Sequence, residues 1–325
     1  KRRTLIQKYT YISNLLEKFN NLRIFTKKNI IREEEILKQN LHKEITSIWK
    51  TDEIKRSRPT PIEEAKWGLA VIEESLWNAV PKLCSRFDNA VEKFTNKRLP
   101  INFSPITFGS WMGGDRDGNP SVTAKITQQV VLLSRWKAAN LYEKELTKII
   151  QELSMHECSK TLKNKVGKSH EPYRVFLRPI RNKMKNTQNE IELYLNKGIP
   201  IRKSLLVNSI NEVILPLSIV YKSLCSVKCK VIANSSVLNL LRQSYSFGLS
   251  LAKLDIRQES DRHQKLLKNI CENLNLGNYQ NWSEKKKISF LSKKFLSKGK
   301  LIPKNMKWTR ENKEVWSTFQ MIAHL

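Results

Sequence analysis

Glycine is the residue that most constrains how this chain folds, because only ten of its 325 residues are glycine. Four of them, Gly109, Gly113, Gly114 and Gly118, lie within the sequence FGSWMGGDRDGNP at 108–120. Glycine permits positive φ and exposes backbone N–H groups, so a loop of this kind can approach an anion closely. Its spacing matches neither a P-loop nor a dinucleotide-binding loop. A calcium loop also fails, because the glycine falls at the wrong position and the twelfth residue is not glutamate.

The chemistry of this loop leaves two interpretations open. Asp115, Arg116 and Asp117 stand among the glycines, and Asn119-Pro120 closes the stretch. One interpretation is an elaborate turn held by aspartate–arginine pairs. The other is an anion-binding site. The residue types alone favour neither.

Most of the remaining chain is predicted to be helical. Thr60-Pro61-Ile62-Glu63 is a capping box with proline at the first helical position, and apolar residues recur at helical spacing as far as Val80. Tyr142, Leu146, Ile149 and Leu153 share one face of a long helix. The expected helices are 3–22, 30–50, 62–80, 127–153, 173–197 and 208–228, the last one starting or interrupted near Pro216.

One stretch follows the period of a strand. In LDIRQES, Leu254 and Ile256 point one way and Asp255 and Arg257 the other, which predicts a strand with one packed side. A helix through Leu267, Ile270 and Leu274 follows. A strand, then charged residues, then a helix is how an α/β barrel presents a site, although one such unit is weak evidence.

Composition limits the classes of function. The formal net charge is +29 and hydrophobic residues make up 40% of the chain, which predicts a folded, strongly basic protein. The basic residues are spread along the chain and accompany no zinc finger or RNA-binding signature, so we expect no nucleic-acid partner. A basic, helical nucleic-acid-binding protein is the less favoured alternative. We also expect no membrane association, because no run of eighteen or more apolar residues occurs.

Five scattered cysteines suggest a reduced, intracellular protein. Cys225 and Cys229 lack the further ligands of a zinc site. No signal-peptide pattern is visible, so we expect a cytoplasmic location.

Four segments together resemble one enzyme family. They are TDEIKRSRPTPIEEAKWG at 51–68, FGSWMGGDRDGNPSVTAKIT at 108–127, EPYRVFLRPIRNKM at 171–184 and FGLSLAKLDIRQESDRH at 247–263. In this order they resemble phosphoenolpyruvate carboxylase of the bacterial type, over its N-terminal to middle portion.

The resemblance implies a fold. Members of the family are largely helical around an eight-stranded β/α (TIM-like) barrel and assemble as homotetramers. We therefore expect a mainly α-helical chain with part of such a barrel, an incomplete fragment of a larger single-chain enzyme. The expected regions are helical 1–105, an active-site loop 108–120, helical 121–245, a barrel strand plus helix 247–275 and a tail 276–325.

The resemblance also implies an activity. The family is a group of carbon–carbon lyases that form oxaloacetate and phosphate from phosphoenolpyruvate and bicarbonate with Mg²⁺ or Mn²⁺, an anaplerotic supply to the tricarboxylic acid cycle. Arg257 matches the catalytic arginine that contacts the substrate phosphate, and pairing with Asp255 or Glu259 is the structural alternative. Trp111 and the loop residues Gly113, Gly114, Asp115, Arg116 and Asp117 match the segment that lines the substrate site.

Five basic residues resemble positions that the family links to phosphate-bearing allosteric activators. They are Arg2, Arg3, Lys55, Arg56 and Arg181. Exposed basic residues without any site are the alternative.

Several family elements do not occur in these 325 residues. They include the T-A-H-P-T-E run with the catalytic histidine, the second signature with its lysine, the metal-binding carboxylates and the H-G-R-G-G loop. We therefore expect the metal ligands outside this segment and no activity from this chain alone. A partial sequence of an authentic carboxylase is the favoured interpretation, and the product of a split or decaying gene is the other.

Overall fold

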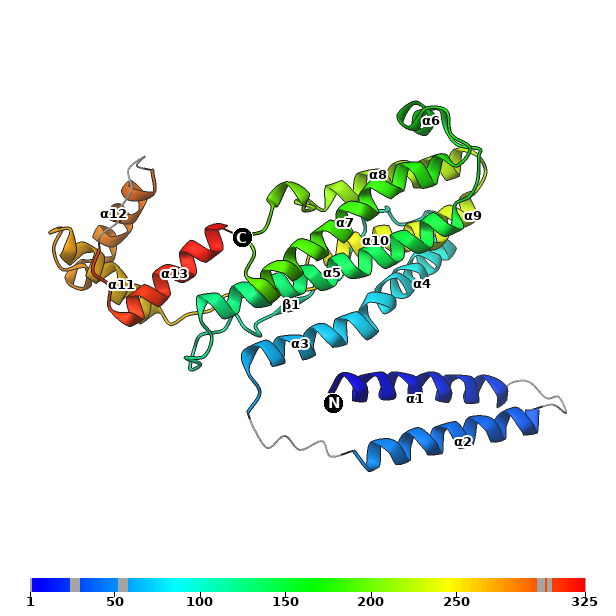
Figure 1. The fold of residues 1–325 in the computed structure, drawn as a ribbon, viewed down its shortest axis with the longest axis horizontal. Helices are drawn as coiled ribbons and strands as arrows, with labels where there is room; N and C mark the ends of the chain where they lie inside the picture. The colour runs from blue at the N-terminus through cyan, green and yellow to red at the C-terminus, as the bar shows by residue number, and fades with distance from the viewer. Residues whose placement is uncertain (1, 24–29, 52–57, 297–301, 303–305, 325) are drawn as a thin grey trace. The chain divides into compact units, whose positions relative to one another are not determined.

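The structure, a computed structural model, describes residues 2–23, 30–51, 58–296, 302 and 306–324, and most of them are helical (Figure 1). The chain divides into two compact units, which are described one at a time. The first unit comprises Lys1–Pro59, Glu63–Gly109 and Leu132–Lys253, and the second comprises Thr60–Ile62, Ser110–Val131 and Leu254–Leu325.

Helices make up the first unit, although the first residues of α3 (Pro61–Val71) and α5 (Ala124–Glu152) belong to the second. The predicted helices at 3–22, 30–50 and 173–197 are confirmed, and α3 begins at Pro61 as the capping box predicts. A π-helical turn, Ile72–Leu76, joins α3 to α4, and a second one, Ala233–Val237, joins α9 to α10. The bounds are α1 Arg2–Arg23, α2 Ile30–Trp49, α3 Pro61–Val71, α4 Trp77–Thr95, α5 Ala124–Glu152, α6 Lys160–Val166, α7 Pro172–Lys197, α8 Asn211–Ser226, α9 Lys230–Ile232 and α10 Leu238–Phe247.

The core of the first unit forms around the long helix α5. Tyr142, Leu146, Ile149 and Leu153 are fully buried, which confirms the predicted apolar face. Trp77 of α4 packs edge-on against Tyr142, with ring centroids 5.3 Å apart. Aromatic pairs of this kind stabilise a core beyond the area they bury.

Pro216 does not interrupt its helix, contrary to the prediction. α8 runs from Asn211 to Ser226 with Pro216 inside it. A proline within a helix costs about 3 kcal/mol. Val213, Leu217 and Val220 on the same helix are completely buried, and we attribute the continuation of the helix to this packing.

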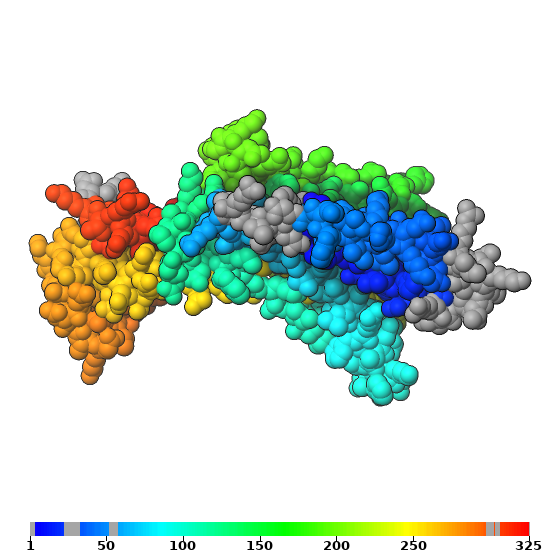
Figure 2. All heavy atoms as spheres, turned by 90° about the horizontal axis from the view of Figure 1, so that it is seen from below, coloured from blue at the N-terminus to red at the C-terminus, as the bar shows by residue number. Residues whose placement is uncertain are grey.

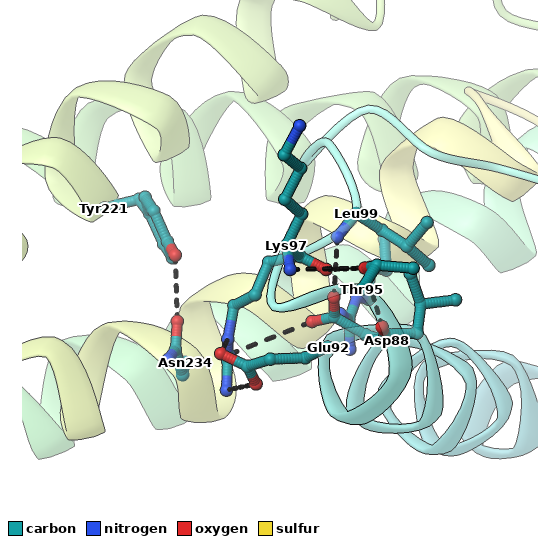
Figure 3. A network of polar contacts seen from close by, with 10 residues as sticks. Asp88, Glu92, Thr95, Lys97, Leu99, Tyr221 and Asn234 are labelled. Carbon is teal, nitrogen blue, oxygen red and sulfur yellow. Dashed lines mark hydrogen bonds and ion pairs between the residues drawn. The ribbon is translucent and has the colours of Figure 1, made fainter.

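A polar network is enclosed within the first unit (Figure 3). Asp88 of α4 is 3% exposed. Its Oδ2 accepts a hydrogen bond from Arg242 Nη2 of α10 at 3.0 Å, and its Oδ1 accepts one from the backbone N–H of Leu99 at 2.8 Å. Arg98 pairs with Glu92 nearer the surface, at 2.7 Å. The buried pair joins α4 to α10 and also fixes the chain where it leaves α4.

The second unit holds the C-terminal helices, seen as orange and red spheres in Figure 2. They are α11 (Ser260–Asn273), α12 (Glu284–Leu296) and α13 (Arg310–His324), with a 3₁₀ turn at Tyr279–Asn281. Leu266 and Ile270 of α11 are buried in one cluster with Val315 of α13. The helix predicted after the strand is therefore confirmed.

The predicted strand is shorter than expected. β2 covers Lys253–Leu254 and pairs with β1, Gly109–Ser110. Lys253 N donates to Phe108 O and Asp255 N donates to Ser110 O, so the two strands run parallel. Ile256, expected on the packed side, is 38% exposed. In the part of the chain that the structure describes, this pair is the only sheet, and a β/α barrel stays a prediction.

The structure also describes the cysteines and the apolar character of the helices. All five cysteines are free thiols, of which Cys84 and Cys271 are buried. Among the described residues, no helix is both long and apolar enough to cross a membrane.

Candidate functional site

The glycine loop lies beside Arg257 within the second unit. Arg257 N donates to Gly114 O at 3.1 Å, and Arg116 N donates to Arg257 O at 3.0 Å. The parallel pairing through Phe108 and Ser110 thus resumes at Gly114, with two extra residues inserted on the loop side. The insertion forms a turn in which Gly114 N and Asp115 N both donate to Trp111 O.

Steric space explains two of the glycines. A Cβ atom at Gly114 would lie 2.1 Å from the carbonyl oxygen of Asp255. At Gly113, where φ is 80°, a Cβ atom would lie 2.6 Å from Val130 Cγ2. These glycines therefore let the loop backbone pack tightly against β2 and α5. Gly118, with φ of 66°, is needed for its conformation, since nothing lies near it.

Arg116 points into the protein. Only 2% of it is exposed. Its Nη1 donates to Gly114 O at 3.1 Å and its Nη2 donates to Thr127 Oγ1 at 2.7 Å, while Nε is buried without a partner. Burial lowers the pKa of Arg116, and the charge of Glu314 opposes that shift. A guanidinium remains charged even so, and here it holds the loop together from within.

Thr127 completes this internal arrangement. It is fully buried on α5, and its hydroxyl donates to Gly113 O at 2.7 Å. Helix α5 begins three residues earlier than predicted, because Thr123 Oγ1 accepts from Ile126 N and Glu314 of α13 accepts from Ala124 N. We had not singled out Thr127, since no motif marks it. The one sequence signal is a hydroxyl in the first turns of a helix that follows the loop.

Three side chains of the site are accessible to solvent, namely Arg257, Asp115 and Trp111. The Arg257 side chain is 63% exposed, and its Nη1 lies 3.4 Å from Asp115 Oδ2. Asp115 Oδ1 also accepts from Asp117 N, and Trp111 is 61% exposed. The ion-pair partner is therefore Asp115, and the suggested partners Asp255 and Glu259 were wrong, since Glu259 lies near Arg262 instead.

Together these residues give a loop with two distinct sides. The buried side, with Arg116 and Thr127, fixes the backbone. The exposed side offers a guanidinium that can bind a phosphate through two parallel hydrogen bonds. Of the expected substrate-binding residues, Arg116 alone has its charged group buried. Direct substrate contact by any of them stays a prediction.

The structure describes the side chain of one of the expected allosteric residues, Arg181. Arg181 lies on α7 in the first unit, where its Nη2 donates to Asn182 Oδ1 at 2.7 Å. Arg2 and Arg3 belong to α1, but their side chains lie outside what the structure describes, and so do Lys55 and Arg56. An allosteric phosphate site stays a prediction.

The residues present do not fit a divalent metal. Within the described ranges, no group of three or more histidine, cysteine or carboxylate side chains is placed to hold one. Asp115, the carboxylate nearest Arg257, is already occupied by the guanidinium and the Asp117 N–H. Mg²⁺ needs near-octahedral oxygen ligation, which this loop does not supply.

Comparison with known proteins gives one family. The family model described as phosphoenolpyruvate carboxylase matches residues 1–325. Phosphoenolpyruvate carboxylases of Marinomonas sp. (strain MWYL1), Hahella chejuensis and Ectopseudomonas mendocina are 44%, 42% and 40% identical to the chain. In each case the similarity covers 99% of this chain and 36% of the relative. The chain thus spans about a third of the length of the curated relatives it matches.

Proposed function

Because the chain belongs to the phosphoenolpyruvate carboxylase family, we propose that it forms part of an enzyme that makes oxaloacetate and phosphate from phosphoenolpyruvate and bicarbonate. The observation that carries the proposal is the family match over all 325 residues. Arg257, exposed beside the glycine loop, supports it. The same proposal includes Mg²⁺ or Mn²⁺ held by residues outside these 325, a cytoplasmic location, a homotetramer and a role in supplying the tricarboxylic acid cycle.

In this reaction Arg257 would bind the phosphate of phosphoenolpyruvate. Bicarbonate oxygen attacks phosphorus, the bond from phosphorus to the enol oxygen breaks, and carboxyphosphate and the pyruvate enolate form. Carboxyphosphate then releases carbon dioxide and phosphate, and the enolate carbon captures the carbon dioxide. A positioned guanidinium stabilises the charge on the transferring phosphoryl group.

Asp115 and Trp111 have supporting roles in the proposal. Asp115 engages one Nη of Arg257 at 3.4 Å, which leaves the remaining N–H groups of the fork for the substrate. Trp111, exposed on the same loop as Asp115, would cover the bound substrate and exclude water.

The proposal also covers a β/α barrel and a binding site for an activator. β2 with α11 would be one strand–helix unit of the β/α barrel, between the helical regions and the tail. Arg181, together with Arg2, Arg3, Lys55 and Arg56, would bind a phosphate-bearing activator.

A hybrid enzyme tests the proposal. Residues 1–325 are joined to the part of the Marinomonas relative that this chain does not span, and phosphate release is measured with and without bicarbonate. We expect bicarbonate-dependent release from the hybrid and none from the 325-residue chain alone. A folded hybrid without activity, alongside an active Marinomonas enzyme, would refute the proposed function. Activity from the chain alone would refute the expectation that it needs the remainder.

A further inference from the structure

The carbonyl groups of the glycine loop are held by two buried side chains. Thr127 Oγ1 donates to Gly113 O at 2.7 Å and accepts from Arg116 Nη2, also at 2.7 Å. Arg116 Nη1 donates to Gly114 O at 3.1 Å. We call this set, namely the Thr127 hydroxyl, the Arg116 guanidinium and the two glycine carbonyls, the loop brace.

The Thr127 hydroxyl is not needed to cap its own helix. Thr123 and Glu314 already accept hydrogen bonds from the first N–H groups of α5. The carbonyl one turn back, Thr123 O, lies 3.2 Å from Thr127 Oγ1, farther than Gly113 O at 2.7 Å. The hydroxyl is therefore directed at the loop, and a buried guanidinium depends on it as an acceptor.

The loop brace connects directly to the backbone of Arg257. Gly114 O accepts both from Arg116 Nη1 and from Arg257 N, and Arg116 N donates back to Arg257 O. The peptide groups on both sides of Arg257 are thus tied to residues that the brace fixes. A shift of Arg116 must move Arg257 or break one of these hydrogen bonds.

We infer that Thr127 is a positioning residue: through Arg116 it fixes where the Arg257 guanidinium is presented to the substrate phosphate. The inference rests on the proposed function for the identity of that substrate. The geometry of the brace does not depend on it. Arg116 itself acts from inside the protein, by holding the loop, and Arg257 is the arginine that contacts substrate.

Amide hydrogen exchange on the 325-residue chain tests the positioning without any substrate. In Thr127→Val, which keeps the side-chain shape but removes the hydroxyl, the amides of Arg116 and Arg257 should exchange about tenfold faster or more, since a charge-assisted hydrogen bond is lost. Thr127→Ser should exchange like the wild type. The matched control is Thr187→Val, because Thr187 is also buried and accepts from Val207 N, but in the first unit.

Two exchange results would overturn the inference. One is unchanged exchange at Arg257 in folded Thr127→Val, and the other is equally fast exchange at Arg257 in Thr187→Val. If Thr127→Val does not fold, Arg116→Lys takes its place, because a lysine cannot bond Gly114 O and Thr127 Oγ1 in the same fork geometry. Faster exchange at the Arg257 amide in Arg116→Lys supports the inference, and unchanged exchange contradicts it.

The hybrid enzyme adds the catalytic measurement. We expect Thr127→Val to lower kcat/KM for phosphoenolpyruvate by about tenfold to a hundredfold, with the KM for bicarbonate unchanged and with recovery in Thr127→Ser. Unchanged kcat/KM would overturn the positioning role even if exchange responds. An inactive wild-type hybrid would instead count against the proposed function, and exchange alone would then decide whether the brace positions Arg257.

Discussion

The buried pair between Asp88 and Arg242 gives the most quantitative prediction for stability. Asp88→Ala leaves the Arg242 guanidinium, whose side chain is 8% exposed, without its carboxylate. It also leaves the Leu99 N–H without its acceptor. Breaking a buried ion pair from one side costs about 3–5 kcal/mol, and an orphaned N–H adds about 1 kcal/mol. We therefore expect a loss of about 4 kcal/mol or more in the free energy of unfolding.

Urea unfolding followed by circular dichroism measures this loss. With a slope of about 3 kcal/mol per molar urea, a 4 kcal/mol loss lowers the midpoint by about 1.3 M. Exchange at the Leu99 amide reports on the same site locally. Glu92→Ala on the same helix is the control, because its partner Arg98 lies near the surface, and we expect a much smaller shift.

A second substitution separates the ion pair from mere loss of volume. In Asp88→Ala combined with Arg242→Met, no buried charge is left unpaired, so most of the lost stability should return. The reasoning fails if Asp88→Ala lowers the midpoint no more than Glu92→Ala does. It also fails if the double variant loses as much free energy of unfolding as Asp88→Ala and Arg242→Met lose together as single variants.

Three further predictions concern the loop, the core and the proposed chemistry. Gly114→Ala should lower the melting temperature more than Gly118→Ala, because the new Cβ atom at position 114 would lie 2.1 Å from Asp255 O. At position 118 the new Cβ atom would face open space, and only the positive φ would disfavour alanine. Equal melting temperatures of the two variants would contradict this. Burial raises the pKa of Tyr142 above its ordinary value of 10.0, so the stability that its neutral form provides is complete below about pH 10 and is lost as the pH rises above it. The urea midpoint should thus fall as the pH is raised from about 9 to about 11. Tyr142→Phe, which also loses the hydrogen bond to Gly248 O, should show a smaller fall over the same pH range. An equal fall in the wild type and in Tyr142→Phe would assign the effect to other groups. In the hybrid enzyme, Arg257→Gln should reduce kcat/KM for phosphoenolpyruvate by about a hundredfold or more and Arg257→Lys by less, and a fully active Arg257→Gln would remove Arg257 from the proposed mechanism.

Local sequence pattern predicted the helices well because their determinants are local. The Thr60–Glu63 capping box and the helical spacing of Tyr142 and Leu146 operate within a few turns of chain, and the structure agrees with both. Pro216 shows the limit of such reasoning. Its helix continues alongside packing with segments distant in sequence, which no local propensity encodes.

The glycine loop and the segment that contains Arg257 were identified from the sequence, but the direction of each side chain was not. The glycines and a strand before Arg257 were predicted from residue pattern and family resemblance, and the structure ends that strand at Leu254. Arg116 points inward and Arg257 points outward. These directions depend on the two inserted residues of the loop, which decide which loop residue lies next to α5. The alternation of a strand predicts that Ile256 is packed, but its neighbours leave it 38% exposed. Thr127 was missed because its role exists only once the helix lies against the loop.

If the proposed function holds, the two interpretations of the loop, a pinned turn and an anion site, are not alternatives. The loop arginine and its neighbour Arg257 have opposite environments: Arg116 is 2% exposed, and the Arg257 side chain is 63% exposed. A guanidinium that must bind a phosphate has to stay accessible, and an accessible long side chain is poorly ordered unless its backbone is fixed. The buried arginine provides that fixed backbone through Gly114 O and its own N–H, at 3.1 and 3.0 Å from Arg257. The pinned turn is thus the condition under which the exposed arginine can serve as an anion site.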